Sequence, residues 1–388
     1  MLYLDNAATT PLHPKALEAM MPYFTEFFAN PSSVYAPAQK VRAAVGEARQ
    51  SIADAIGAER DEIFFTSGGT EADNWAIKGV LDSRGGHIIT SSVEHHGVLY
   101  VFEHLKKQGF EVTYLPVDTE GLVDPASLEE AIRPDTRLIS VIFANNEVGS
   151  IQPIKELGAI ANQHGIPFHT DAVQAVGHLP IDVKALGIDM LALSAHKFYG
   201  PKGIGALYVK RGTKLAPVLH GGAQENNRRA GTENVTGIIG MAAALRASLD
   251  EMPGEFTRVS ALRDRLINEI LEKIPHTKLN GATGEKRLPG NVNISFSFIE
   301  GELFLSHLSM NDCCVSTGSA CSSNAHEPSH VLMAMGLDSV LANCAIRFSL
   351  GRVNTEADIT NLMSILQPTA EKLLKQSVLY DMHLKNKR

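Results

Sequence analysis

The sequence has no long apolar run and no excess of positive charge. Its 388 residues include 35 Lys and Arg against 43 Asp and Glu, a formal net charge of −8 at pH 7. This balance argues against a basic groove for nucleic acid or for an anionic membrane surface. No segment reaches the roughly 18 consecutive apolar residues of a membrane-spanning helix, and the first residues lack the basic and apolar regions of a secretory signal. We therefore expect a cytoplasmic protein that acts on a small molecule, with no membrane or nucleic-acid partner.

Cysteine is also scarce. All four cysteines lie between Cys313 and Cys344, too few for a disulfide framework in a chain of this size, and they suit a reducing compartment. Their spacing contains no Cys-x2-Cys pair, so a metal or iron–sulfur site is the less favoured alternative. Cys321 lies in a run of small and polar residues that predicts a loop, where a nearby cation can make a thiol nucleophilic. The other three cysteines have more apolar neighbours and are expected to be buried.

Short apolar runs alternate with segments of helical periodicity between residues 61 and 209. This alternation predicts an α/β fold in which helices flank a mostly parallel sheet, with ligands bound at the carboxyl ends of the strands. The expected strands are 62–66, 87–90, 111–116, 138–144, 167–170, 189–193 and 202–210. The expected helices between them are 71–81, 98–108, 154–164 and 183–186.

A smaller α+β unit is expected to follow. A long helix from about 235 to 252 should end at Pro253-Gly254 and connect the two units. Further strands are expected at 291–298 and 345–350 in the smaller unit. The chain contains no internal repeat and no low-complexity segment.

Two residues at strand ends suggest cofactor chemistry. Lys197 follows strand 189–193 in a turn, where its amine can form a Schiff base with a carbonyl group; the alternative is a solvated loop lysine. Asp171 closes strand 167–170, where a carboxylate can pair with a protonated pyridine nitrogen; the alternative is a helix N-cap. Both residues belong to the edge of the sheet where ligands bind.

Other strands also end in polar residues. Thr70 follows strand 62–66 in a Gly-Gly-Thr turn that can cradle a phosphate or simply cap a helix. His95 follows the next strand and can stack on a planar ring or act as an acid or base, although most single histidines are structural. Asn145 follows strand 138–144. With Asp171 and Lys197, these residues are expected to converge in one crevice.

Arg347 is expected to project from a strand of the smaller unit. Arginine can bind a substrate carboxylate through two hydrogen bonds, and the alternative here is an ion pair within the chain.

Several ordered motifs extend over nearly the whole chain. In the first half they are Leu4-Asp-Asn-Ala-Ala-Thr-Thr-Pro, Asn30-Pro-Ser-Ser, Thr66-Ser-Gly-Gly-Thr-Glu-Ala-Asp-Asn, Glu94-His95, Asn145-Asn-Glu and Asp171-Ala-Val-Gln174. In the second half they are Ser194-Ala-His-Lys-Phe-Tyr-Gly-Pro-Lys-Gly, Arg229-Ala-Gly-Thr-Glu-Asn, Ser319-Ala-Cys321 and Ile346-Arg-Phe-Ser-Leu-Gly-Arg. Together they resemble the NifS/IscS-type cysteine desulfurases, a branch of the fold-type-I pyridoxal phosphate enzymes.

The resemblance implies a role for each matching residue. Lys197 would hold pyridoxal 5'-phosphate covalently, Asp171 would pair with its ring nitrogen, and His95 would stack on the ring. Asn145 and Gln174 would contact the ring and its 3-oxygen, and Arg347 with Asn145 would hold the cysteine carboxylate. The phosphate would be bound by Gly69, Thr70, Ser194, His196 and, from the neighbouring subunit of a homodimer, Thr232.

The resemblance also implies a domain division and a reaction. A large cofactor-binding domain would span 15–253, and a small domain, 1–14 with 254–388, would carry the Cys321 loop. Lys197 would move the Cα proton of L-cysteine and the Cys321 thiolate would take the sulfur as a persulfide, releasing L-alanine. The persulfide would pass to an acceptor such as an iron–sulfur scaffold protein. The alternatives are a selenocysteine lyase or another fold-type-I enzyme with the same cofactor.

Overall fold

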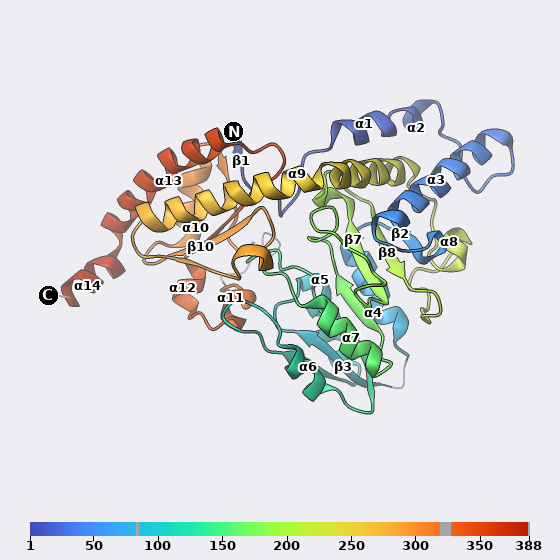
Figure 1. The fold of residues 1–388 in the computed structure, drawn as a ribbon, viewed down its shortest axis with the longest axis horizontal. Helices are drawn as coiled ribbons and strands as arrows, with labels where there is room; N and C mark the ends of the chain where they lie inside the picture. Colours follow the sequence, from blue (N-terminus) through green and yellow to red (C-terminus); the bar gives the residue numbers. More distant parts are fainter. Residues whose placement is uncertain (83–84, 319–326, 387–388) are drawn as a thin grey trace.

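The computed structural model describes residues 1–82, 85–318 and 327–386 (Figure 1). Its largest feature is a seven-stranded sheet in the order β2-β8-β7-β6-β5-β3-β4, in which β8 is antiparallel to both neighbours and all other neighbouring pairs are parallel. The predicted α/β fold with a mostly parallel sheet is therefore confirmed. The strands are β2 (Ile63–Thr66), β3 (Gly86–Ser91), β4 (Phe110–Leu115), β5 (Thr136–Ser140), β6 (Phe168–Asp171), β7 (Met190–Ser194) and β8 (Gly205–Val209).

Helices cover both faces of this sheet. Every residue of β7 and β8 is buried, as is typical of central strands in a sheet enclosed on both sides. One face packs against α3 (Ala36–Ala55), α7 (Ile154–Gln163) and the first half of α9 (Val235–Lys273), and the other against α4 (Gly69–Val80) and α5 (His96–Lys107). The other helices of this part are α1 (Pro14–Met20), α2 (Pro22–Thr25), α6 (Pro125–Ala131) and α8 (Gln224–Asn227).

One of the four predicted helices of this region is wrong. Residues 183–186 form a single turn instead of a helix. Asp182 Oδ1 accepts hydrogen bonds from the amides of Lys184 at 2.9 Å and Ala185 at 3.0 Å, and Gly187 ends the turn with a positive φ of 68°. A side chain that bonds to the backbone in this way competes with helix formation.

The prediction that the long helix ends at Pro253-Gly254 is also wrong. α9 continues through Pro253 to Lys273 and crosses the molecule (Figure 1). Proline inside a helix removes one hydrogen bond and costs about 3 kcal/mol. Here residues of the first half, such as Met241, are buried in the core under the large sheet, and residues of the second half, such as Leu266, are buried in a second core. Burial at both ends stabilises the continuous helix, and Pro253 itself is exposed.

The second core lies around two small sheets. An antiparallel sheet has the order β12-β10-β9, and β1 pairs in parallel with β11. α13 packs beside the second half of α9 (Figure 1). The strands are β1 (Leu2–Tyr3), β9 (Thr277–Leu279), β10 (Asn291–Phe296), β11 (Cys313–Cys314) and β12 (Ala345–Ser349). The helices are α10 (Gly301–Ser309), α11 (His330–Ala334), α12 (Ser339–Asn343), α13 (Glu356–Gln376) and α14 (Val378–Asn386). Within the described ranges, no helix is long and apolar enough to cross a membrane.

Candidate active site

Lys197 lies in a turn at the carboxyl end of a central strand. β7 leads directly into the short 3-10 helix η2 (Ala195–Lys197). The side-chain amine donates to the carbonyl oxygens of Ala7 at 2.6 Å and Ala8 at 2.8 Å, and the Lys197 carbonyl accepts a hydrogen bond from His178 Nε2 at 2.9 Å. The lysine is therefore a half-buried amine with a fixed orientation.

The N-terminal segment 5–13 runs across this turn. Gln174 Nε2 donates to the Ala7 carbonyl at 2.9 Å, the same oxygen that accepts from the Lys197 amine. The structure thus brings Gln174 and Lys197 together at one backbone oxygen. Sequence reasoning missed this contact, because a backbone carbonyl carries no residue-specific signal.

Asp171 ends β6, the strand next to β7. Its side chain is 5% exposed, and Oδ1 accepts a hydrogen bond from the Val173 amide at 2.9 Å. Burial raises the pKa of Asp171, while the positive charges of His95 and Lys197 act in the opposite direction. A cation placed against this carboxyl group would favour its ionised form further. Residues 173–178 form turns, so Asp171 caps a turn and not the α-helix of the alternative interpretation.

The start of α4 faces the ends of β6 and β7. A Cβ added to Gly69 would lie 2.6 Å from Val173 Cγ2 and 3.7 Å from Ser194 Cβ, so only glycine allows this close approach. The free amides of a helix N-terminus attract anions, and the buried Ser194 lies beside them. Glu71, in the first turn, pairs with Arg229 Nε at 2.7 Å, which compensates its negative charge. An anion can therefore bind here without facing an unpaired carboxylate.

His95 and Thr70 lie side by side next to this helix start. His95 is the N-cap of α5, and its Nδ1 accepts a hydrogen bond from the Gly97 amide at 3.0 Å. A Cβ added to Gly97 would lie 3.0 Å from His95 Nδ1 and 3.5 Å from Thr70 Oγ1. The hydrogen bond to Nδ1 fixes the ring of His95, and Thr70 is exposed.

His196 is held next to Lys197 by the N-terminal segment. Its Nδ1 lies 3.1 Å from Thr9 Oγ1, and its carbonyl accepts a hydrogen bond from Thr10 Oγ1 at 2.9 Å. Burial and the positive charges of Lys197 and Lys202 lower the pKa of His196 to about 4. The ring is therefore neutral near pH 7 and carries one N–H donor.

Arg347 and Asn145 have fixed orientations. Arg347 Nη2 donates to Asp5 Oδ1 at 2.9 Å and Nη1 to the Asn146 carbonyl at 3.0 Å, so the ion pair of the alternative interpretation is present. Its Nε has no hydrogen-bond partner within the part of the chain that the structure describes. Asn145 Nδ2 donates to the Val93 carbonyl at 2.9 Å, and its Oδ1 accepts from two backbone amides that follow it.

Two predicted site residues are not part of this cluster. Cys321 lies outside the described residues. Thr232 is exposed in the loop between α8 and α9, which the ion pair of Arg229 with Glu71 ties to α4.

Two of the three described cysteines have unreactive surroundings. Cys313 and Cys344 are buried as predicted, whereas Cys314 is only half-buried. Burial raises the pKa of Cys313 to about 12 and also raises that of Cys344. No group of three or more His, Cys, Asp or Glu among the described residues is arranged to hold a metal ion.

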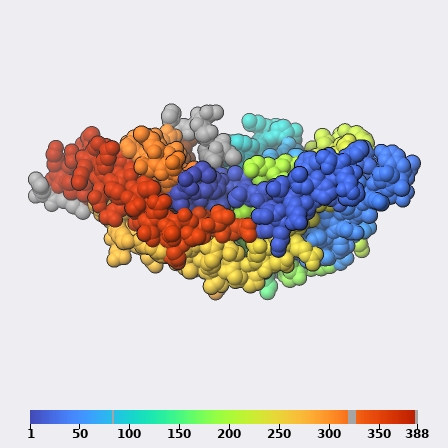
Figure 2. All heavy atoms as spheres, turned by 90° about the horizontal axis from the view of Figure 1, so that it is seen from above, coloured from blue at the N-terminus to red at the C-terminus, as the bar shows by residue number. Residues whose placement is uncertain are grey.

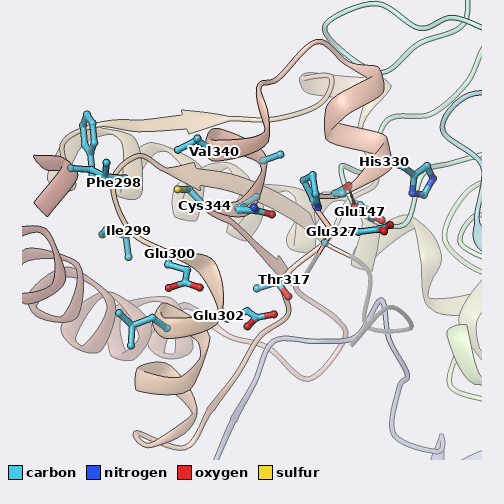
Figure 3. A pocket seen from close by; sticks show the side chains of 18 of the residues that line it. Glu147, Phe298, Ile299, Glu300, Glu302, Thr317, Glu327, His330, Val340 and Cys344 are labelled. Carbon is cyan, nitrogen blue, oxygen red and sulfur yellow. Dashed lines mark hydrogen bonds between the residues drawn. The ribbon is translucent and has the colours of Figure 1, made fainter. Parts of the chain in front are cut away.

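A cavity of about 670 Å³ lies between the small-sheet region and the start of α5 (Figure 3). Glu147, His330 and Cys344 line it, together with Gly318 and Glu327, the described residues on either side of the segment that contains Cys321. Ser329 Oγ donates to Glu147 Oε2 at 2.5 Å at this wall. The chain on both sides of Cys321 therefore borders one cavity.

Comparison with known proteins places the chain in a family. The sequence pattern of the class-V aminotransferases matches residues 2–362. The cysteine desulfurase IscS of Dictyoglomus turgidum is 55% identical over 375 residues, which covers 96% of this chain and 95% of that protein. This chain belongs to the cysteine desulfurases of the class-V aminotransferase family.

Solved structures of other proteins have the same fold. A NifS-like protein superposes with a TM-score of 0.89 at 36% identity, covering 96% of this chain and 99% of that one. A structure described as SspA in complex with cysteine has a TM-score of 0.80 at 40% identity, covering 90% of this chain and 99% of that one. As a member of this family, the chain is a pyridoxal phosphate-dependent enzyme.

The residues present fit this cofactor. A cofactor with a ring nitrogen, an aldehyde and a phosphate needs a carboxylate, an amine and an anion site. Asp171 supplies the buried carboxylate and Lys197 the oriented amine, each at the carboxyl end of neighbouring strands. The close approach of Gly69 leaves the amides of the α4 start facing the same ends.

Sequence reasoning missed a group of buried acids and a histidine near this site. Asp73, Glu94 and His169 are buried and lie near Asp171. The sequence did contain a spacing signal for His169 and Asp73. His169 precedes Asp171 by two positions in one strand, and Asp73 follows Gly69 by four in one helix, so each shares a face with a site residue.

Proposed function

We propose that this chain removes sulfur from L-cysteine, releases L-alanine and carries the sulfur as a persulfide on Cys321. The observation that carries this proposal is the placement of Asp171 and Lys197 at neighbouring strand ends in a chain whose close relatives are cysteine desulfurases. A structure of SspA with cysteine, from a relative of the same fold, supports L-cysteine as the substrate.

The proposed cofactor site uses the residues of the cluster. Lys197 binds the cofactor covalently, Asp171 faces the ring nitrogen and His95 lies against the ring. Asn145 and Gln174 contact the ring and its 3-oxygen. The phosphate is bound by Gly69, Thr70, Ser194, His196 and the Thr232 of a neighbouring subunit. Bound pyridoxal phosphate supplies an electron sink that makes the Cα proton of an amino acid acidic.

Proton transfer is assigned to Lys197 and sulfur transfer to Cys321, and two other residues hold the substrate. Arg347 and Asn145 hold the substrate carboxylate, and the unpartnered Arg347 Nε supports this role. Lys197 takes the Cα proton and returns it during turnover. The Cys321 thiolate attacks the substrate sulfur; the carbon–sulfur bond breaks with its electrons on carbon, which takes up a proton and leaves as part of L-alanine. Cys321 then carries the extra sulfur.

The proposed domain division is 15–253 and 1–14 with 254–388. The hydrophobic core around the small sheets supports it, because this core draws all its residues from 1–14 and 254–388. We also propose that the protein works in the cytoplasm and that its persulfide passes to an acceptor protein such as an iron–sulfur scaffold.

Product analysis tests the proposed reaction. Purified protein is incubated with L-cysteine, L-alanine is quantified, and added sulfur is located by mass spectrometry of the peptide that contains Cys321. We expect C321A to keep the absorbance of the bound cofactor and to lose sulfur transfer. The matched variant C344A, at a buried thiol, should keep both.

Two outcomes contradict the proposal. Wild-type sulfur transfer in C321A would remove the role of this thiol. Bound cofactor without L-alanine formation would place the activity elsewhere among enzymes with this cofactor.

A further inference from the structure

A pair of buried titratable groups next to Asp171 has no role in the proposed reaction. Asp73, on α4, is 1% exposed, and His169, on β6, is fully buried. Asp73 Oδ1 and His169 Nε2 are 3.5 Å apart, and neither atom has a hydrogen-bond partner elsewhere in the described ranges. An unpartnered polar atom in the interior is costly, so the two atoms are expected to share a proton.

The surroundings of the pair determine its charge. His169 Nδ1 lies 2.8 Å from Ser140 Oγ on β5, which leaves Nε2 for Asp73. Burial lowers the pKa of His169 to about 3. Burial also raises the pKa of Asp73 well above its usual range, and the nearby carboxyl groups of Asp171 and Glu94 raise it further. His169 is therefore uncharged near pH 7, and the surroundings of Asp73 favour its protonated form.

The two neighbouring acids differ in the charges that face them. His95 and Lys197 favour the ionised form of Asp171. The titratable groups that act on Asp73 are the carboxyl groups of Asp171 and Glu94, and both disfavour its ionised form. Two carboxyl groups that interact in one buried site do not both ionise. The negative charge therefore belongs to Asp171 and the proton to Asp73.

We propose that Asp73 is a positioning residue for the reaction: it donates its proton to His169 Nε2, and this uncharged pair keeps Asp171 as the ionised carboxylate that faces the cofactor. Geometry supports this role, because Asp73 contacts His169, which precedes Asp171 by two residues in β6. The role of Asp73 rests on the proposed pairing of Asp171 with the ring nitrogen. The protonation of Asp73 does not depend on that pairing.

Infrared spectroscopy of the holoenzyme tests the protonation directly. A protonated carboxyl group has a carbonyl stretch that is distinct from the bands of a carboxylate and shifts in D2O. We expect D73N to remove one such band at neutral pH and E94Q to remove another. The exposed control D54N should remove none.

Two histidine variants test the sharing of the proton. H169L removes the acceptor, so the Asp73 band should move to the higher frequency of a carboxyl group without a hydrogen bond. H169Q keeps an acceptor and should leave the band near its wild-type position. The Glu94 band should stay unchanged in both, which shows that the fold is intact. If D73N removes no band, or if the band does not move in H169L, the proposal is wrong.

The pH dependence of the bound cofactor tests whether Asp73 carries a charge beside Asp171. D73N replaces an uncharged acid by an uncharged amide, so the midpoint of the cofactor absorbance titration should match wild type. If Asp73 were ionised, its removal would lower that midpoint by about one unit or more, and the proposal would fail. These spectra need no L-cysteine, so their outcome is separate from that of the desulfurase test.

Discussion

At the scale of single residues, Glu94 shows how burial links charge to stability. Its Oε1 accepts hydrogen bonds from Ser91 Oγ at 2.5 Å and from the Ile142 amide at 2.8 Å, and burial raises its pKa to about 8. The folded protein therefore holds a proton that the unfolded chain, with a value near 4.5, releases. The stability that this proton contributes is complete below the unfolded pKa and is lost as the pH rises toward 8.

The variant E94Q should reduce this loss. Glutamine stays uncharged and keeps an oxygen acceptor for the Ser91 hydroxyl and the Ile142 amide. Between about pH 4.5 and 8, wild type should lose about 1.4 kcal/mol of stability per pH unit through Glu94, and E94Q should not. Urea unfolding at pH 5 and pH 8 measures the difference. Parallel pH dependences of the two proteins would show that Glu94 is ionised in the folded state.

Residues at strand ends could be predicted from the sequence, whereas for the buried residues behind them the sequence indicated at most a face shared with a site residue. Lys197 and Asp171 follow apolar strands directly, so strand alternation alone places them at the ligand edge. Asp73 lies inside a helix, where a single acidic residue is typical of a solvated face. Only the packing of α4 against the sheet reveals that Asp73 is buried beside His169.

At the scale of elements, the position of the start of α4 depends on the lack of a side chain at Gly69. A Cβ at Gly69 would lie 2.6 Å from Val173 Cγ2, so G69A must push the helix start away from the turn after β6. We expect the affinity for pyridoxal phosphate to fall by about tenfold or more, which corresponds to about 1.4 kcal/mol. The helix itself should persist, because alanine is the better helix former.

The matched control lies in α9. Nothing lies within 4 Å of a Cβ added to Gly254, and its backbone is helical. G254A should therefore leave cofactor affinity unchanged and raise stability by about 0.5–1 kcal/mol. Titration of the cofactor absorbance and urea unfolding measure the two effects. Equal cofactor affinity in G69A and wild type would show that the approach of α4 to Val173 is not needed for binding.

At the scale of elements, the prediction that α9 ends at Pro253-Gly254 was wrong for a physical reason. Pro253 and Gly254 are strong local signals for a helix end. Long-range burial outweighs them here, since Met241 and Leu266 belong to two different cores joined by the same helix. A local sequence pattern does not show that a second core begins shortly after Pro253-Gly254. The order of strands and helices could therefore be predicted better than the continuous helix α9 that joins the two cores.

At the scale of the whole molecule, one group of exposed apolar residues lies in the N-terminal segments, toward one end. The N-terminal segments form one end of the elongated surface, opposite the C-terminal helices (Figure 2). Large apolar side chains in residues 17–35 are unusually exposed, and isolated soluble proteins rarely leave such patches open. They are Leu17, Met21, Phe24, Phe28, Val34 and Tyr35.

We propose that a second copy of this chain covers these residues in a homodimer, which would also bring a partner Thr232 to the phosphate site. Phe28 and Val34 are 77% and 84% exposed, so a charge at either position should not disturb the fold of one subunit. The double variant F28D/V34D should shift the protein from twice the chain mass of 41.9 kDa to the single mass in analytical ultracentrifugation. Phosphate contacts from the partner would be lost, so its cofactor affinity should fall as well.

The control V378D/M382D places the same charges on exposed apolar residues of α14, at the other end of the molecule. It should sediment as wild type does and keep its cofactor affinity. Both variants add the same charge to surface positions, so a difference between them reports the location of the interface and not a general effect on solubility. A wild-type protein that sediments as a monomer at micromolar concentration with full cofactor occupancy would contradict both the dimer and the assignment of Thr232.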